Sequence, residues 1–193
     1  MNFLLALGSL IFLISSVYFL FFFKKKLNSA FFVSFITLIS YLVMLEGSFI
    51  TSGLSWTRWI GYAFSCSLLI YVISKKLNLP YSKQISNIFL NIIVMITGTF
   101  ASINSNEYKW YFFIISTLAY SKLIHEIFNS KSKKLKNISN YIIYGWSVFP
   151  LVFLISNEGL NFIIVEVSVF IYLILDFFTK IVFYIKDKEF SKN

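Results

Sequence analysis

Asp176 and Lys180 are oppositely charged residues four positions apart within an apolar stretch, residues 173–183. On a helix, positions four apart lie on one face, so the carboxylate and the amine can meet. Each charge alone costs roughly 2.5 to 3.5 kcal/mol near the centre of a bilayer, so a pair kept there indicates a functional site. An amine in a dry pocket beside a carboxylate can also condense with an aldehyde to form a Schiff base. The alternative is that Lys180, near Lys186 at the helix end, extends its amine toward water.

The composition predicts that this stretch lies in a membrane. Hydrophobic residues make up 58% of the 193 residues, with 24 Phe, 12 Tyr and only two Pro, and the apolar runs exceed what a soluble domain of this size could bury. Seven apolar segments approach the length needed to span a bilayer: 3–23, 30–50, 56–74, 85–103, 108–127, 138–155 and 162–185. We therefore expect an all-α membrane protein, a single seven-transmembrane-helix bundle over residues 1–193, and not an enzyme.

The charges predict how the bundle is oriented. Lysines cluster in alternate loops and at the tail, within residues 24–26, 75–83, 131–136 and 186–192, whereas the intervening loops carry Glu107, Glu158 and Glu166. By the positive-inside rule, the N-terminus is outside, the C-terminus is cytoplasmic, and the chain crosses the cell membrane several times. The net charge of +9 therefore reflects topology beside anionic lipid and does not indicate nucleic acid. Cys66 is the only cysteine, which excludes an intrachain disulfide, and we expect no metal site.

Residues 146–159, followed by Asp176 and Lys180, resemble the last two helices of the microbial rhodopsins along a continuous third of the chain. The resemblance implies that Lys180 carries all-trans retinal as a protonated Schiff base and that Asp176 belongs to its counterion. Helical spacing puts four residues on one face that could clamp the polyene, with the proline bending the helix: Trp146, Phe149, Pro150 and Phe153. An ordinary aromatic core is the alternative explanation for these four.

Shorter matches to the family occur on three earlier helices. Arg58 matches the family arginine below the Schiff base, and Tyr62 stands where a tryptophan usually packs on retinal. Tyr41 matches a tyrosine that bonds the aspartate of the seventh helix. Thr117 and Tyr120 would lie near the ring end of the pocket. These roles are implied by the resemblance alone.

The departures from the family concern proton transport. In its outward proton pumps, the third helix carries an acidic proton acceptor and an acidic donor, and Gly61 and Val72 occupy those positions here. Without these two stations, outward pumping is disfavoured. The remaining counterion is Asp176, helped by Arg58 and by Glu46 on the outer part of the second helix. A protonated Schiff base needs negative charge nearby, so Asp176 should be ionised in the dark.

Four hypotheses about function remain. The schizorhodopsins, which are light-driven inward proton pumps, share the short length, the non-acidic residue at Gly61 and the Ser-Cys pair Ser65–Cys66, but carry a glutamate where Val72 stands. Anion-pumping rhodopsins also have a neutral residue at the Gly61 position, and a glycine there would leave room for a halide. A sensory photoreceptor without net transport is the third, favoured by Thr179. A structural membrane protein that has lost retinal is the fourth.

Inward proton transport is the first hypothesis. The proton would leave the Schiff base through the cytoplasmic half, with Ser65 and Cys66 lining the start of the path, and would be replaced from outside past Arg58, Glu46 and Glu158. Glu158 occupies the position of a proton-release glutamate in outward pumps, although a solvated loop charge is the alternative. His125 and Glu126 could assist at the inner end, where a solvated helix end is again the alternative. The resemblance also implies a homo-oligomer, a trimer or a pentamer.

Overall fold

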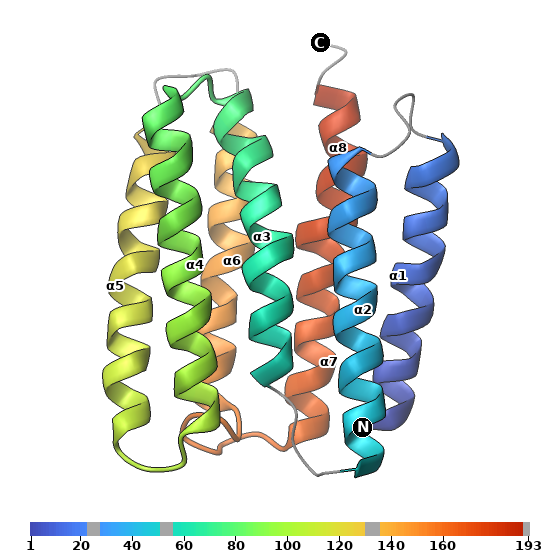
Figure 1. Ribbon diagram of the computed structural model, residues 1–193, viewed down its shortest axis with the longest axis vertical. Helices are drawn as coiled ribbons and strands as arrows, with labels where there is room; N and C mark the ends of the chain where they lie inside the picture. Colours follow the sequence, from blue (N-terminus) through green and yellow to red (C-terminus); the bar gives the residue numbers. More distant parts are fainter. Residues whose placement is uncertain (23–27, 51–55, 130–135, 191–193) are drawn as a thin grey trace.

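The computed structural model describes residues 1–22, 28–50, 56–129 and 136–190, and over these ranges the chain forms an antiparallel bundle of helices (Figure 1). The helices are α1 (Asn2–Phe22), α2 (Ser29–Ile50), α3 (Trp56–Lys76), α4 (Tyr81–Ile103), α5 (Tyr108–Phe128) and α6 (Lys136–Ile155). The seventh helix of the bundle consists of three consecutive segments: α7 (Val165–Asp176), the π-helical segment η2 (Phe177–Val182) and α8 (Phe183–Phe190). We call each of the seven continuous helical stretches a rod. The predicted seven-helix fold is confirmed.

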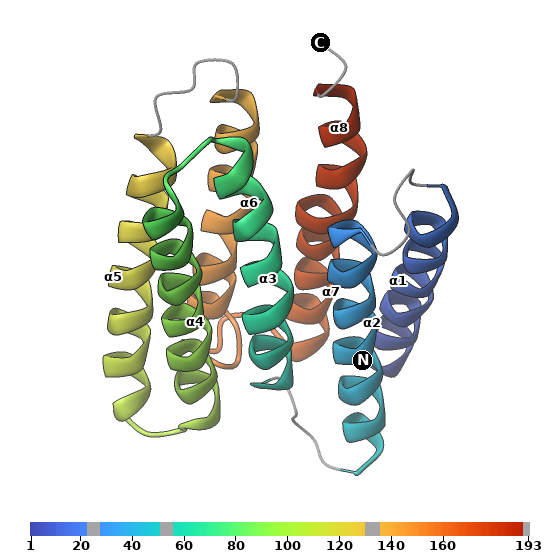
Figure 2. The same cartoon turned by 45° about the horizontal axis from the view of Figure 1, so that its top comes forward.

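The bundle has two chemically different ends. We call the end that carries Lys75, Lys76 and Lys83 the lysine-rich end, and the end that carries Glu107 and Glu158 the opposite end. The C-terminal α8 lies at the lysine-rich end (Figure 1). In both views α1 and α5 lie on opposite sides of the bundle, with α3 between them (Figure 2). Because α3 packs against both α2 and α4, side chains on α3 can reach both halves of the interior.

Among the described residues, four helices are long and apolar enough to cross a membrane by these criteria alone: Asn2–Phe22, Ser29–Gly47, Tyr81–Ile103 and Val165–Lys186. In hydrocarbon every backbone polar group needs a partner within the protein, which a helix supplies. Hydroxyls on these helices also bond the carbonyl one turn back, as Ser16 does to Phe12 at 2.7 Å and Thr37 to Val33 at 2.8 Å. Large apolar side chains cover the outer surface, where lipid replaces water.

The seventh rod begins three residues later than the sequence predicts. Residues 161–164 form the turn that leads into it, because Asn161 adopts a left-handed conformation with φ of 59° and Ile164 is extended, with φ of −70° and ψ of 159°. Asparagine tolerates that left-handed region better than most residues. Phe162 is therefore an exposed residue of the connection, and the helix starts at Val165.

The π-helical segment η2 begins directly after Asp176 and contains Lys180. A π-turn takes one more residue than an α-turn, and such turns are frequent at functional sites. The Thr179 hydroxyl donates to the Leu175 carbonyl at 2.7 Å, and the Tyr141 hydroxyl from α6 donates to the Phe178 carbonyl at 2.8 Å. Side-chain donors thus bond backbone carbonyls at the widened turn, and Lys180 lies within it.

Candidate functional site

Lys180 and Asp176 form an ion pair in the interior of the bundle. Lys180 Nζ lies 2.9 Å from Asp176 Oδ1, and the two side chains are 1% and 0% exposed. The alternative in which Lys180 extends its amine toward water is therefore wrong. A buried pair of this kind is stable only while both partners are present, because removing one leaves an uncompensated charge.

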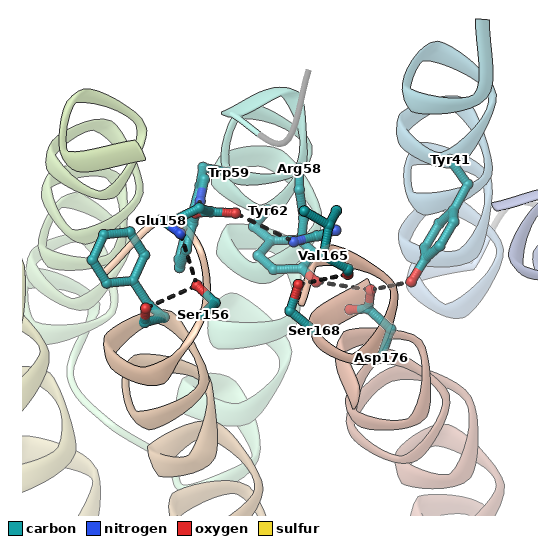
Figure 3. A network of polar contacts seen from close by, with 10 residues as sticks. Tyr41, Arg58, Trp59, Tyr62, Ser156, Glu158, Val165, Ser168 and Asp176 are labelled. Atoms are coloured by element: carbon teal, nitrogen blue, oxygen red, sulfur yellow. Dashed lines mark hydrogen bonds and ion pairs between the residues drawn. The ribbon is translucent and has the colours of Figure 1, made fainter. Parts of the chain in front are cut away.

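Two tyrosines from different helices complete the surroundings of Asp176. Its second oxygen, Oδ2, accepts hydrogen bonds from Tyr41 of α2 at 3.0 Å and from Tyr62 of α3 at 2.8 Å (Figure 3). The Tyr62 ring also lies against Lys180, with Nζ 4.0 Å from the ring centroid. The carboxylate thus faces the amine with one oxygen and two hydroxyls with the other.

An aromatic-lined cavity adjoins this pair, and Tyr62 borders both. Small-molecule sites are mostly apolar with a few polar groups, as this cavity is. Seven residues that the resemblance assigned to the chromophore pocket line this cavity: Tyr62, Thr117, Tyr120, Trp146, Phe149, Pro150 and Phe153. Tyr41 lies instead on the Asp176 side. The aromatic walls of the cavity and the adjacent amine fit a long apolar aldehyde.

Trp59 is a site residue that the sequence reasoning missed. One face of its ring fills the space beside Gly98, where an added Cβ would lie 3.1 Å from the indole, and its edge contacts Phe153 with ring centroids 5.8 Å apart. Its Nε1 donates to Glu158 Oε2 at 3.1 Å. Trp59 therefore lines the cavity and bonds a carboxylate beyond it. The only sequence feature that could have identified Trp59 as a site residue is its position directly after Arg58.

Glu158 and Arg58 form a second buried cluster toward the opposite end. Arg58 Nη1 lies 3.8 Å from Glu158 Oε1, and the guanidinium carbon lies 4.1 Å from the centroid of the Tyr172 ring. Arg58 is 2% exposed and Glu158 is 8% exposed, so the solvated-loop alternative for Glu158 is wrong. Lys109 Nζ donates to the Gly159 carbonyl at 2.7 Å, which ties α5 to this loop. Figure 3 shows the cluster beside the Asp176 network.

Two expected ion-pathway residues lie elsewhere. Glu46 lies five residues after the buried Tyr41 on α2 and is exposed. Over five residues a helix turns about 140° beyond a full turn, so the two side chains point in different directions. Glu46 therefore points away from the interior, and the expectation that it helps Asp176 is wrong. Gly61 leaves no room for a halide either. An added Cβ there would overlap the Ser40 side chain, because α2 and α3 approach closely at this point.

The contact at Gly61 gives a first prediction. Gly61→Ala should lower the free energy of unfolding by about 1 to 3 kcal/mol, the usual cost of overpacking a filled interior. Ser40→Gly in the same chain should recover most of the loss, because it removes the Cβ that lies 2.8 Å from the added atom. Equilibrium unfolding of the four members of this double-mutant cycle measures the coupling. Additive effects of the two substitutions would contradict the close approach.

The predicted path residues toward the lysine-rich end differ in burial. Ser65 is fully buried and donates to the Gly61 carbonyl at 3.0 Å, while Cys66 is buried and lines the cavity. His125 is exposed and contacts Asn129, as expected for a solvated helix end. Glu126 differs from that expectation, because it is half-buried and one carboxylate oxygen, Oε2, is enclosed and has no hydrogen-bond partner in residues 1–22, 28–50, 56–129 and 136–190.

Known proteins show what the chain is similar to. A family model described as bacteriorhodopsin-like protein matches residues 1–186. The crystal structure of schizorhodopsin 4 is 39% identical, with a TM-score of 0.88 and coverage of 96% of this chain and 97% of that one. Bacteriorhodopsin-I of Haloarcula marismortui is 22% identical over 177 residues, which cover 78% of this chain and 71% of the relative. The light-driven chloride pump halorhodopsin shares the fold, with 18% identity, a TM-score of 0.83 and coverage of 95% and 91%.

Proposed function

This chain belongs to the bacteriorhodopsin-like protein family, and we propose that within it the protein is a light-driven inward proton pump. Members of this family are microbial rhodopsins, which are multi-pass membrane proteins that bind retinal. The proposal adds three things to that membership: the attachment site, the ion and the direction. The lysine-rich end faces the cytoplasm in this proposal, as the positive-inside rule predicts.

Lys180 is the proposed attachment site of all-trans retinal. Its amine is buried, it adjoins the aromatic cavity across Tyr62, and it lies 2.9 Å from Asp176. When bound, retinal supplies a light-driven change of shape at the lysine nitrogen. Tyr62, Trp146 and Phe149 hold the polyene in place, and Asp176 balances the positive charge on that nitrogen. The tight apolar walls exclude water from the linkage.

The single observation that carries the direction is the surroundings of Asp176. Its Oδ1 faces Lys180, and its Oδ2 already accepts two hydroxyl hydrogen bonds, from Tyr41 and Tyr62. Because both oxygens of Asp176 are already engaged, an incoming proton would have to displace one of these partners. Gly61, the other position where an outward pump places an acceptor, contacts Ser40. The proton on the lysine nitrogen therefore leaves toward the lysine-rich end.

The cluster of Arg58 and Glu158 is the proposed entry side. Glu158 is 8% exposed and lies at the edge of the bundle, where it holds both Arg58 and Trp59. A buried carboxylate at this place can take a proton from water and pass it inward, with Arg58 setting the local charge. The close contact at Gly61 removes the space on which the chloride alternative depended. A homo-oligomer, trimer or pentamer, stays a prediction.

The transport proposal is tested in an unbuffered suspension of cells that express the protein with retinal. Light should make the medium more alkaline, and a protonophore should abolish the change, because inward protons then leak back. Anion uptake also raises the external pH, because the potential it creates draws protons in, but a protonophore enhances that signal. Alkalinisation enhanced by protonophore, or no change of pH in either condition, would contradict inward proton transport.

A further inference from the structure

If protons leave toward the lysine-rich end, as proposed above, they need a route through that half of the bundle. The third helix offers no carboxylate there, since Val72 stands at the position concerned. Three apolar side chains of α3 fill the interior at this level, with Leu69 and Ile70 fully buried and Ile73 nearly so. A proton that leaves Lys180 therefore needs polar groups beside these side chains.

Buried polar side chains join α3 to α4 along this half. Asn91 donates to Ser67 at 2.9 Å, and nearer the lysine-rich end Asn87 donates to Ser74 at 3.4 Å. Asn87 and Ser74 are fully buried, and Asn91 is 1% exposed. We call these four residues the α3–α4 polar row. Its inner member Asn91 lines the same cavity as Cys66, so the row starts beside the chromophore site.

Holding two helices together would not account for the whole row. Among the described residues, Asn87 Oδ1 finds no hydrogen-bond partner, and it has no contact with solvent. An unpaired buried amide oxygen costs free energy, and buried waters typically bond such groups. The Asn87 oxygen is therefore placed to bind a water molecule that can carry a proton.

Along the bundle axis, Glu126 of α5 supplies a carboxylate at a level just beyond that of Asn87. The Ser116 hydroxyl of α5 donates to the Val94 carbonyl of α4 at 3.0 Å, which fixes the register of these two antiparallel helices. Counted from that contact, Asn87 lies seven residues along α4 and Glu126 ten residues along α5. At 1.5 Å per residue, Glu126 is about 4.5 Å further toward the lysine-rich end. Its enclosed Oε2 has no hydrogen-bond partner within the part of the chain that the structure describes.

We propose that Glu126 accepts the proton that leaves the Lys180 nitrogen, and that water held by the α3–α4 polar row conducts it there. The N–H bond at Lys180 breaks, an O–H bond forms at the Glu126 carboxylate, and Glu126 then releases the proton to water at the lysine-rich end. In this role Glu126 replaces the carboxylate missing at Val72. Asn87 is a positioning residue, since it acts through the bound water.

The test uses the full-length protein with retinal and the variants Glu126→Gln and Asn87→Leu. Light-minus-dark infrared spectra should show the carbonyl stretch of a newly protonated carboxylic acid in the wild type and lose it in Glu126→Gln. Transient proton release at the lysine-rich end, followed with a pH dye, should slow on the order of a hundredfold in Glu126→Gln, as expected for loss of a positioned acid–base group. Asn87→Leu should slow release and keep the carboxylic acid band. Glu126→Asp should restore the release rate.

His125→Gln is the matched control, because His125 is the exposed neighbour of Glu126 on α5, and it should match the wild type in both measurements. A carboxylic acid band that persists in Glu126→Gln, or release at the wild-type rate in both variants, would overturn the assignment. The infrared band is recorded in single turnovers and does not require net transport. A band that depends on Glu126 in cells that show no pH change would therefore reject inward pumping and keep this proton acceptor.

Discussion

Lys180→Ala is expected to remain colourless when all-trans retinal is added, whereas the wild-type protein becomes coloured. Alanine has no amine to condense with the aldehyde, so the chromophore cannot be linked to the chain. The substitution also leaves Asp176 buried without its partner at 2.9 Å. Absorption spectra of the purified proteins after incubation with retinal measure the effect. Lys122→Ala, at an exposed lysine of α5, is the control and should become coloured.

Two results would contradict this assignment. Wild-type protein that shows only the absorbance of free retinal would mean that the chain does not form a pigment. A visible band in Lys180→Ala would mean that another amine carries the chromophore. Borohydride reduction of the wild-type pigment followed by peptide mass spectrometry identifies the modified lysine, and we expect the peptide that contains Lys180.

Asp176→Asn is expected to shift the absorbance of the pigment to the ultraviolet near neutral pH. The carboxylate balances the positive charge at the lysine nitrogen, and removing one partner of a buried pair costs about 3 to 5 kcal/mol. At about 1.4 kcal/mol per pH unit, the pH at which half of the visible band is lost should fall by roughly two to four units. The sign follows because the loss of negative charge disfavours the protonated nitrogen. Acidification of the variant should therefore restore the visible band.

Glu46→Gln is the matched control for Asp176→Asn. Glu46 is exposed on α2, so the variant should keep the wild-type spectrum and its pH dependence. An unchanged visible band in Asp176→Asn would contradict the assignment of Asp176 as counterion. A shift in Glu46→Gln comparable with that in Asp176→Asn would show that Glu46 reaches the site, against its position on the helix.

The sequence predicted those parts of the structure that depend on local pattern. Lengths of apolar segments placed six of the seven rods within a few residues at each end, and the spacing of Asp176 and Lys180 placed two charges on one face. The start of the last rod was missed because the left-handed turn at Asn161 is set by bonds to the end of α6. The π-helical turn around Lys180 has no periodic signal that could have indicated it.

Contacts between helices were harder to predict. Tyr62 was assigned only as an aromatic wall, and its hydrogen bond to Asp176 depends on how far apart α3 and α7 lie. The Gly61 position was interpreted as empty space because a missing side chain does not reveal which neighbour fills it, and Ser40 does. The outward direction of Glu46, in contrast, could have been found from its helical angle to Tyr41. Burial of Glu158 requires the α6–α7 loop to fold back on Trp59.

Photocurrents recorded under voltage clamp test inward proton transport most directly. Cells that express the protein with retinal are held at zero membrane potential in symmetrical solutions, with chloride replaced by a large impermeant anion. We predict an inward current on illumination, which persists without chloride and is absent in Lys180→Ala. An outward current would indicate outward cation transport, or anion uptake if it required chloride, and no current would indicate a sensor. Either result would contradict the proposal that light moves protons inward through this bundle.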